Sequence, residues 1–142
     1  MGSRNDPYGN FNFIVEIDGL GAAGFAEVSG LTTESDVIEY RNGNEDISVR
    51  KLPGLKKYTD ITLKRGFTQN KELWEWRKQL LDGQTQRRNG SIIVLDEARN
   101  EVLRFTFQEA WPVRWDGPDL DAQGKGVAIE TLVIAHEGLF QP

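Results

Sequence analysis

Cysteine is absent from this sequence of 142 residues, and histidine occurs once, at His136. The lack of cysteine excludes disulfide bonds, thiolate metal sites and cysteine nucleophiles. A single histidine excludes most zinc sites and leaves one imidazole as a candidate base. Glu137 is adjacent to it, but neighbouring residues of a strand point to opposite faces. We therefore expect a structural or interface role for His136 rather than a catalytic one.

Long apolar runs and an excess of positive charge are missing as well. No run approaches the ~20 residues that a membrane-spanning helix needs, and the first ten residues are polar, so we expect no membrane anchor. The net charge is −5, which argues against nucleic acid as the main partner. An apolar content of 38% with fifteen glycines is typical of a soluble, turn-rich β protein. The length predicts a single domain covering residues 1–142.

One segment, residues 70–82, has clear helical periodicity. Steps of 100° per residue gather its apolar side chains within an arc of about 160°; they are Leu73, Trp74, Trp76, Leu80 and Leu81. Thr68 to Asn70 offers capping side chains at its start, and Gly83 can adopt the left-handed conformation that ends a helix. Arg77 lies near the middle of the apolar arc. Its stem either packs on a tryptophan with its head in water, or it forms an ion pair at a subunit contact.

The remaining chain has the alternation and turn spacing of short strands. The candidate strands are Phe11–Asp18, Phe25–Gly30, Leu31–Tyr40, Tyr58–Phe67, Ser91–Leu95, Val102–Glu109, Ala110–Trp115 and Gly126–His136. The last of them is apolar on both faces, so we expect it to be central, or to be covered on its outer face by another element or another subunit. Between Tyr40 and Gly54 the periodicity fades, which predicts a loop or long arm. The fold class that follows is mainly β: an antiparallel β-barrel or closed sandwich of about seven or eight strands, with the one helix packed on its side.

Two motifs that suggest chemistry lack the context to support it. The glycines between Gly19 and Gly24 match a dinucleotide fingerprint, but no crossover helix fits behind them, so we expect a hairpin turn. Asp116, Asp119 and Asp121 lack the glycine and distal glutamate of a calcium loop and are expected to be a solvated acidic loop. We predict no catalytic, cofactor or metal site.

Basic residues recur in four adjacent pairs, which leave two interpretations open. The pairs are Arg50-Lys51, Lys56-Lys57, Lys64-Arg65 and Arg87-Arg88. Together with exposed aromatic residues they are compatible with a stand-alone β-barrel binding module for single-stranded nucleic acid or another polymer. Charge complementarity between copies of the same chain accounts for the mixture of signs equally well.

Several motifs, in order along nearly the whole chain, resemble the tail tube proteins of contractile phages, extracellular contractile injection systems and R-type bacteriocins. That family is similar in fold to the haemolysin-coregulated protein of type VI secretion. The motifs are Asp6-Pro7, Phe11–Gly19, Phe25–Leu31, Lys51–Gly54, Lys57-Tyr58, Leu63–Gly66, Leu73–Trp76, Ile92–Glu97, Ala110–Pro112, Ala128–Leu132 and Ala135–Leu139.

The resemblance implies a non-enzymatic, mechanical role. It implies a single tail-tube β-barrel domain whose copies form homohexameric rings, stacked into a hollow tube. Its implied partners are a sheath protein, baseplate and spike proteins, and protein or DNA cargo in the lumen. Sheath contraction would drive the tube through a target envelope. The implied location is the bacterial cytoplasm for synthesis, followed by a phage tail or a phage-tail-like particle capable of release.

Loop length and mixed charge point to candidate interface residues for such an assembly. The arm from Tyr40 to Gly54 is the first candidate for the contact between stacked rings, and the segment Arg4–Asn10 and the acidic loop are two others. The individual candidates are Arg41, Asn44, Glu45, Asp46, Arg50, Lys51, Arg77, Asp119 and Asp121.

Overall fold

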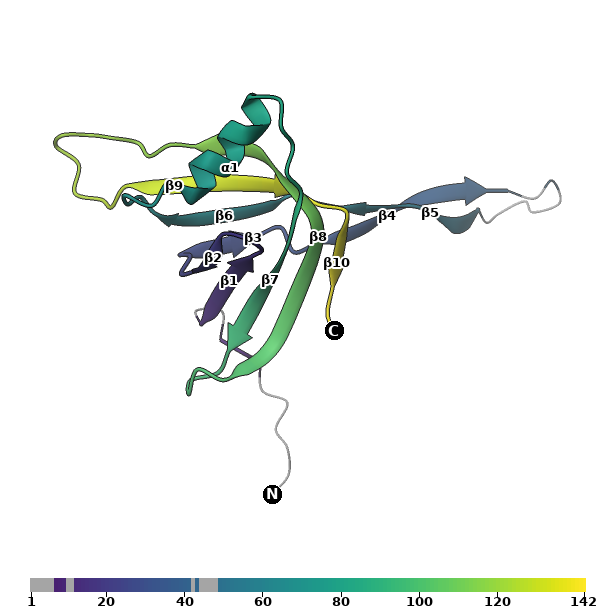
Figure 1. The fold of residues 1–142 in the computed structure, drawn as a ribbon. Helices are drawn as coiled ribbons and strands as arrows, with labels where there is room; N and C mark the ends of the chain where they lie inside the picture. Colours follow the sequence, from purple (N-terminus) through teal and green to yellow (C-terminus); the bar gives the residue numbers. More distant parts are fainter. Residues whose placement is uncertain (1–6, 10–11, 42, 44–48) are drawn as a thin grey trace, which may run out of the picture.

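The computed structural model describes residues 7–9, 12–41, 43 and 49–142. Over these residues the chain forms ten strands and one helix (Figure 1). Their bounds are β1 Phe13–Ile17, β2 Gly21–Ala23, β3 Glu27–Ser29, β4 Thr33–Tyr40, β5 Arg50–Tyr58, β6 Ile61–Gly66, α1 Glu72–Leu81, β7 Arg88–Leu95, β8 Glu101–Asp116, β9 Ile129–Ala135 and β10 Gly138–Phe140.

Eight of the strands form one antiparallel sheet in the order β2-β1-β7-β8-β9-β6-β3, with β10 added beside β8. The sheet folds over into two layers, with β9 and β6 in one and β1, β2 and β7 in the other (Figure 1). Within the described residues the end strands β2 and β3 do not pair with each other, so hydrogen bonding does not close a complete barrel. The predicted mainly-β sandwich with one helix is confirmed.

The long strand β8 connects the two layers. Its first part, up to Ala110, pairs with β7, and its second part, from Trp111, pairs with β9. The register shifts between Pro112 and Arg114, and Glu109 has a positive φ of 56°. Such irregularities bend a strand and allow it to pass from one layer to the other. The two separate strands predicted from Val102 to Trp115 are therefore one bent strand.

The structure also changes the strand boundaries predicted around Tyr58. The expected strand Tyr58–Phe67 begins at Ile61, and Tyr58 is the last residue of β5. The predicted loop before it contains strand from Arg50 onward. Strand β5 has no buried residue, so its sequence lacks the apolar alternation that marks a half-buried strand.

The glycine-rich turn after β1 is a hairpin, as the sequence predicts. Strand β2 pairs with β1 through Ile17 and Gly21, and Gly19 has a φ of +82° in the turn between them. No helix follows this turn, because the next described element is the strand β3. The dinucleotide fingerprint is therefore excluded for this segment.

The core lies between the two layers and beneath α1. On β6 and β9, alternate residues point inward, and Ile61, Leu63, Leu132 and Ile134 have no exposed surface. The helix contributes Leu73 and Trp76, each 2% exposed. The Trp76 indole N–H donates to the Gln86 carbonyl at 2.8 Å, which satisfies the one polar atom of this buried ring.

The C-terminal end of α1 is formed as the sequence predicts, whereas the N-cap is Lys71, just after the predicted capping segment Thr68–Asn70. The Asn70 side-chain oxygen accepts a hydrogen bond from the Glu72 amide at 2.9 Å. At the other end Gly83 has a φ of +89°, its amide donates to Leu80, and the Gln84 amide donates to Gln79. These two bonds form a Schellman motif, which ends the helix and satisfies its last carbonyls.

A buried ion pair connects the core strands to the helix. Arg65 of β6 and Glu130 of β9 are 6% and 1% exposed, and the Arg65 Nε donates to the Glu130 Oε1. The other Glu130 oxygen accepts from the Trp115 indole at 3.1 Å, and the guanidinium also reaches the Asn70 carbonyl at 3.4 Å. The guanidinium lies over the Phe25 ring at 5.6 Å. Strands β6, β8 and β9 and the segment before α1 therefore meet at one polar cluster.

Removal of one partner of this pair should be costly. Glu130→Ala leaves the Arg65 charge buried without a counter-ion, and we expect the free energy of unfolding in urea to fall by about 3 to 5 kcal/mol. The double variant Arg65→Met with Glu130→Leu removes both charges and should recover most of that loss. A fall below about 1 kcal/mol for Glu130→Ala would contradict the assigned role of the pair.

Two glycines with positive φ provide a second test of the fold, because their substitution by alanine should cost different amounts of stability. Gly83 has open space where a Cβ would lie, so Gly83→Ala should cost only about 1 kcal/mol of backbone strain. Gly30, with a φ of +92°, lies against the Asp60 carbonyl, so Gly30→Ala adds a backbone clash and should cost about 3 kcal/mol. Thermal unfolding of both variants measures which one loses more stability. Equal losses of stability would contradict the close approach at Gly30.

Candidate assembly surfaces

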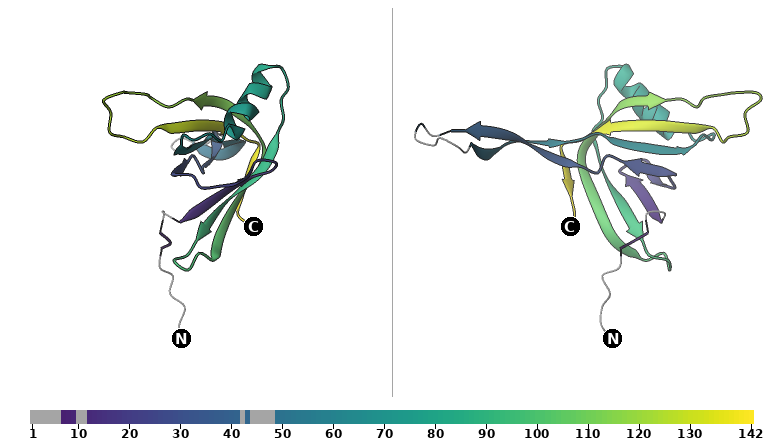
Figure 2. Two further views of the ribbon diagram at one scale, coloured as in Figure 1. Left: turned by 60° about the vertical axis from the view of Figure 1, so that its left-hand side comes forward. Right: turned by 180° about the vertical axis from the view of Figure 1, so that it is seen from behind.

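Strands β4 and β5 form an arm that leaves the body of the molecule. They pair with each other in a separate two-stranded sheet, and within the described residues neither has another neighbouring strand. The arm projects from one side of the molecule, as Figure 1 and the right-hand view of Figure 2 show. Large apolar side chains are exposed along it; they are Val37, Ile38, Tyr40, Leu52 and Leu55. A two-stranded ribbon is only marginally stable alone, so this surface is suited to being covered.

Charge is segregated between the two strands of the arm. Strand β4 carries three acidic residues, Glu34, Asp36 and Glu39, and no basic one. Strand β5 carries four basic residues and no acidic one; they are Arg50, Lys51, Lys56 and Lys57. The Lys57 amine lies 2.8 Å from the Asp36 carboxylate, which raises the pKa of Lys57. Farther along the ribbon Lys51 lies opposite Glu39, while Lys56 lies opposite Ser35.

The root of the arm is fixed to the body through Thr59. Its hydroxyl donates to the Gly30 carbonyl at 3.0 Å, and its amide donates to the Thr32 carbonyl at 3.3 Å. The Thr59 carbonyl lies 3.0 Å from the His136 Nε2. The two chain segments that enter and leave the arm are thereby held together. His136 is buried and makes ring contacts with Tyr58 and Phe107, so it occupies a structural position at this root.

A groove lies at the other end of the molecule, beside the loop that joins β8 to β9. Its volume is about 650 Å³. Its lining comes from β3, β6, β8, the loop and β9, and includes Glu27, Lys64, Arg114, Asp116, Asp119 and Ile129. Two cations of the groove are already paired: Arg114 with Asp116 at 3.0 Å and Lys64 with Glu27 at 3.7 Å.

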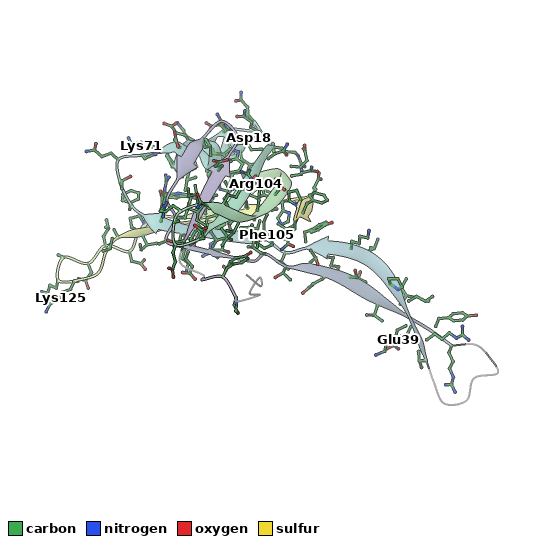
Figure 3. All side chains as sticks on the ribbon, turned by 90° about the horizontal axis from the view of Figure 1, so that it is seen from below. Asp18, Glu39, Lys71, Arg104, Phe105 and Lys125 are labelled. Atoms are coloured by element: carbon green, nitrogen blue, oxygen red, sulfur yellow. The ribbon has the colours of Figure 1, made fainter. Side chains whose placement is uncertain are left out.

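The predicted interface residues fall into two distant groups and one isolated position. Arg41, Arg50 and Lys51 lie on the arm and are exposed, while Asp119 and Asp121 lie on the exposed loop. Figure 3 shows the two groups at opposite ends, with Glu39 on the arm and Lys125 on the loop. The predicted candidates Asn44, Glu45 and Asp46, and most of the segment Arg4–Asn10, lie outside the described residues.

Arg77 has a partner within its own chain. It is half-buried on α1, and its guanidinium donates to the Pro112 carbonyl of β8 at 3.0 Å. The head of the side chain therefore contacts the body. An ion pair with another subunit is not needed to explain it.

Sequence reasoning missed the charge segregation of the arm and the Arg65–Glu130 pair. Lys56 and Lys57 were counted as a basic pair, but their strand was not recognised, so their relation to the acids of β4 was not visible. For Arg65 a signal existed, since it follows Ile61 and Leu63 on the apolar face of its strand. Glu130 likewise shares a face with Leu132 and Ile134. Two opposite charges on inward faces predict a buried pair.

A second, mostly apolar pocket of about 520 Å³ lies beside α1, and its lining includes Trp74 and Trp115. The centroids of these two rings are 5.0 Å apart. In the part of the chain that the structure describes, no group of acidic or histidine side chains is arranged to hold a metal ion. No described helix has the length and apolar character required to cross a bilayer.

Comparisons with solved structures relate this geometry to tube proteins. A chain of the sheath–tube complex of PVC, an extracellular contractile injection system, is similar with a TM-score of 0.88 and 26% identity, covering 97% of this chain and 93% of that chain. A chain of the anti-feeding prophage baseplate is similar with a TM-score of 0.88 and 26% identity, covering 98% of this chain and 97% of that chain. Hcp1 from Flavobacterium johnsoniae shares the fold, with a TM-score of 0.61, 20% identity and coverage of 93% and 100%.

Comparisons of the sequence lead to the same group of proteins. The model of the family described as T4-like virus tail tube protein gp19 matches residues 9–140. A search of curated proteins gives no significant match. The alternative of a stand-alone binding module for single-stranded nucleic acid or another polymer has no support in these comparisons. The predicted resemblance is confirmed, and the chain belongs to the T4-like virus tail tube protein family.

Proposed function

We propose that copies of this chain build the inner tube of a contractile injection machine, by closing into hexameric rings that stack around a hollow lumen. The surrounding sheath would contract and drive the tube through a target envelope, delivering protein or DNA cargo. The role is mechanical, and the chain performs no catalysis in it. Similar chains occur in a sheath–tube complex, a baseplate and a tube-terminating cap, which supports sheath and baseplate proteins as partners.

The observation that carries this proposal is the arm. Strands β4 and β5 contribute no residue to the core cluster, yet they display several large apolar side chains. Leu55 is 74% exposed and Val37 is 60% exposed. An extended element of this kind gains stability when a neighbouring copy covers it, because apolar surface is then removed from water.

The asymmetry of the molecule favours rings and tubes over a two-fold dimer. The arm and the acidic loop differ in shape and charge and lie at opposite ends (Figure 3). Contacts between unlike surfaces are heterologous, and they generate closed rings or open filaments according to the rotation between copies. We assign Arg41, Arg50 and Lys51 to contacts made by the arm, and Asp119 and Asp121 to contacts made by the loop.

Assembly should depend on the apolar surface of the arm. The double variant Ile38→Ser with Leu52→Ser changes one cross-strand pair far from the core. We expect the free energy of unfolding to change by only about 0.5 kcal/mol, because both side chains are exposed, while rings and tubes disappear from negative-stain electron micrographs. Sedimentation velocity on the same samples measures the loss of assembled material.

A matched control is Leu81→Ser at the end of α1, which removes a leucine that is 58% exposed, against 47% for Leu52. This variant should assemble like the unmodified protein. Equal loss of assembly in both variants would show that the apolar surface of the arm has no specific role in assembly. The proposed function itself would be contradicted if the unmodified protein stayed monomeric at high concentration, even with its baseplate proteins present.

A further inference from the structure

The groove at the loop end combines apolar and acidic surface. Ile129 and Ala26 line it together with Asp116 and Asp119. Lys64 pairs with Glu27 and Arg114 pairs with Asp116, so these four charges balance. The third acid of the lining, Asp119, gives the groove its net negative charge. Leu120, 82% exposed, extends the apolar surface along the loop beside it. A fitting occupant would therefore be extended, basic and partly apolar.

Strand β5 has this combination of properties. Leu55 and Leu52 are exposed among four cations, and no acidic residue interrupts the strand. The cross-strand partner of Lys56 is Ser35, whereas Lys51 and Lys57 lie opposite the acids Glu39 and Glu34. An extended strand presents such side chains at regular intervals, which suits an elongated groove.

Within one molecule the two surfaces cannot meet. The arm and the loop point away from each other on opposite sides of the body, as the right-hand view of Figure 2 and the labelled residues in Figure 3 show. The root at Thr59 holds the arm in that direction through hydrogen bonds to Gly30 and Thr32. Only the groove of another copy is available to the arm.

We propose that the β5 side of the arm of one copy docks in the loop-end groove of a second copy, with Lys56 and Leu55 near Asp119 and Leu120. The inference rests on the proposed function and specifies which surfaces meet in it. The contact is head-to-tail, since each copy offers an arm to one neighbour and a groove to another. Charge complementarity selects this arrangement over contacts between two arms.

The absence of cysteine makes cross-linking a direct test. Leu55→Cys and Leu120→Cys are introduced singly and together into the full chain, which is then treated with a short bifunctional maleimide. Each single variant has one thiol and cannot form species larger than a dimer. The double variant should give a ladder of covalent oligomers on denaturing gels, because every chain links to two neighbours through unlike ends.

Charge reversal tests the same contact without cross-linking. Lys56→Glu and Asp119→Lys should each raise the protein concentration at which assembly begins about tenfold, because like charges then face each other. Combining both reversals in one chain should restore assembly close to that of the unmodified protein. Lys78→Glu, a reversal of an exposed cation on α1, is the matched control and should have no effect.

The outcomes separate this inference from the proposed function. Tubes without a ladder from the double cysteine variant would overturn the docking inference and leave the function in place. Strong dimers from Leu55→Cys alone would overturn it as well, because they indicate contacts between arms. Absence of rescue by the combined reversals would contradict the pairing of Lys56 with Asp119. Absence of rings and tubes in the unmodified protein under all conditions would contradict the function.

Discussion

The buried pair of Arg65 and Glu130 sets the relative positions of most other parts of the molecule. It joins β6 to β9, accepts a hydrogen bond from the Trp115 indole of β8 and donates one to the backbone just before α1. A charged group in a dry interior is tolerated only with its partners in place, so the strands and the helix have few alternative arrangements. The same strands line the loop-end groove and lead to the arm, so a rigid body orients both projecting surfaces.

The chain divides its apolar residues between two tasks. Residues of the body, such as Leu63, Leu132 and Trp76, are buried and stabilise a single subunit. Residues of the arm, such as Leu55 and Val37, stay exposed and contribute little to that stability. The core cluster of the body includes no residue of the arm. Association with a neighbouring copy would add the burial that the isolated arm lacks.

Sequence patterns predict the parts of this fold that have a buried side. The helix was found because Leu73 and Trp76 recur at helical spacing, and Gly83 marked its end. The central position of β9 followed from its two apolar faces. Strand β5 was missed because nothing in the subunit covers it, so Arg50 to Tyr58 carries no alternation to detect. The candidates Arg41 and Asp119 were placed on projecting surfaces, but their separation to opposite ends depends on the three-dimensional path of the chain.

The fixed direction of the arm has a consequence for any polymer that these subunits form. In the docking arrangement proposed above, an extending assembly would display unoccupied arms at one extremity and unoccupied grooves at the other, so the polymer would be polar. A protein that starts growth would then bind one of these surfaces, and a protein that stops growth would bind the other. Initiation and termination would therefore use two chemically different partners, one complementary to the basic, partly apolar strand β5 and the other to the net acidic groove.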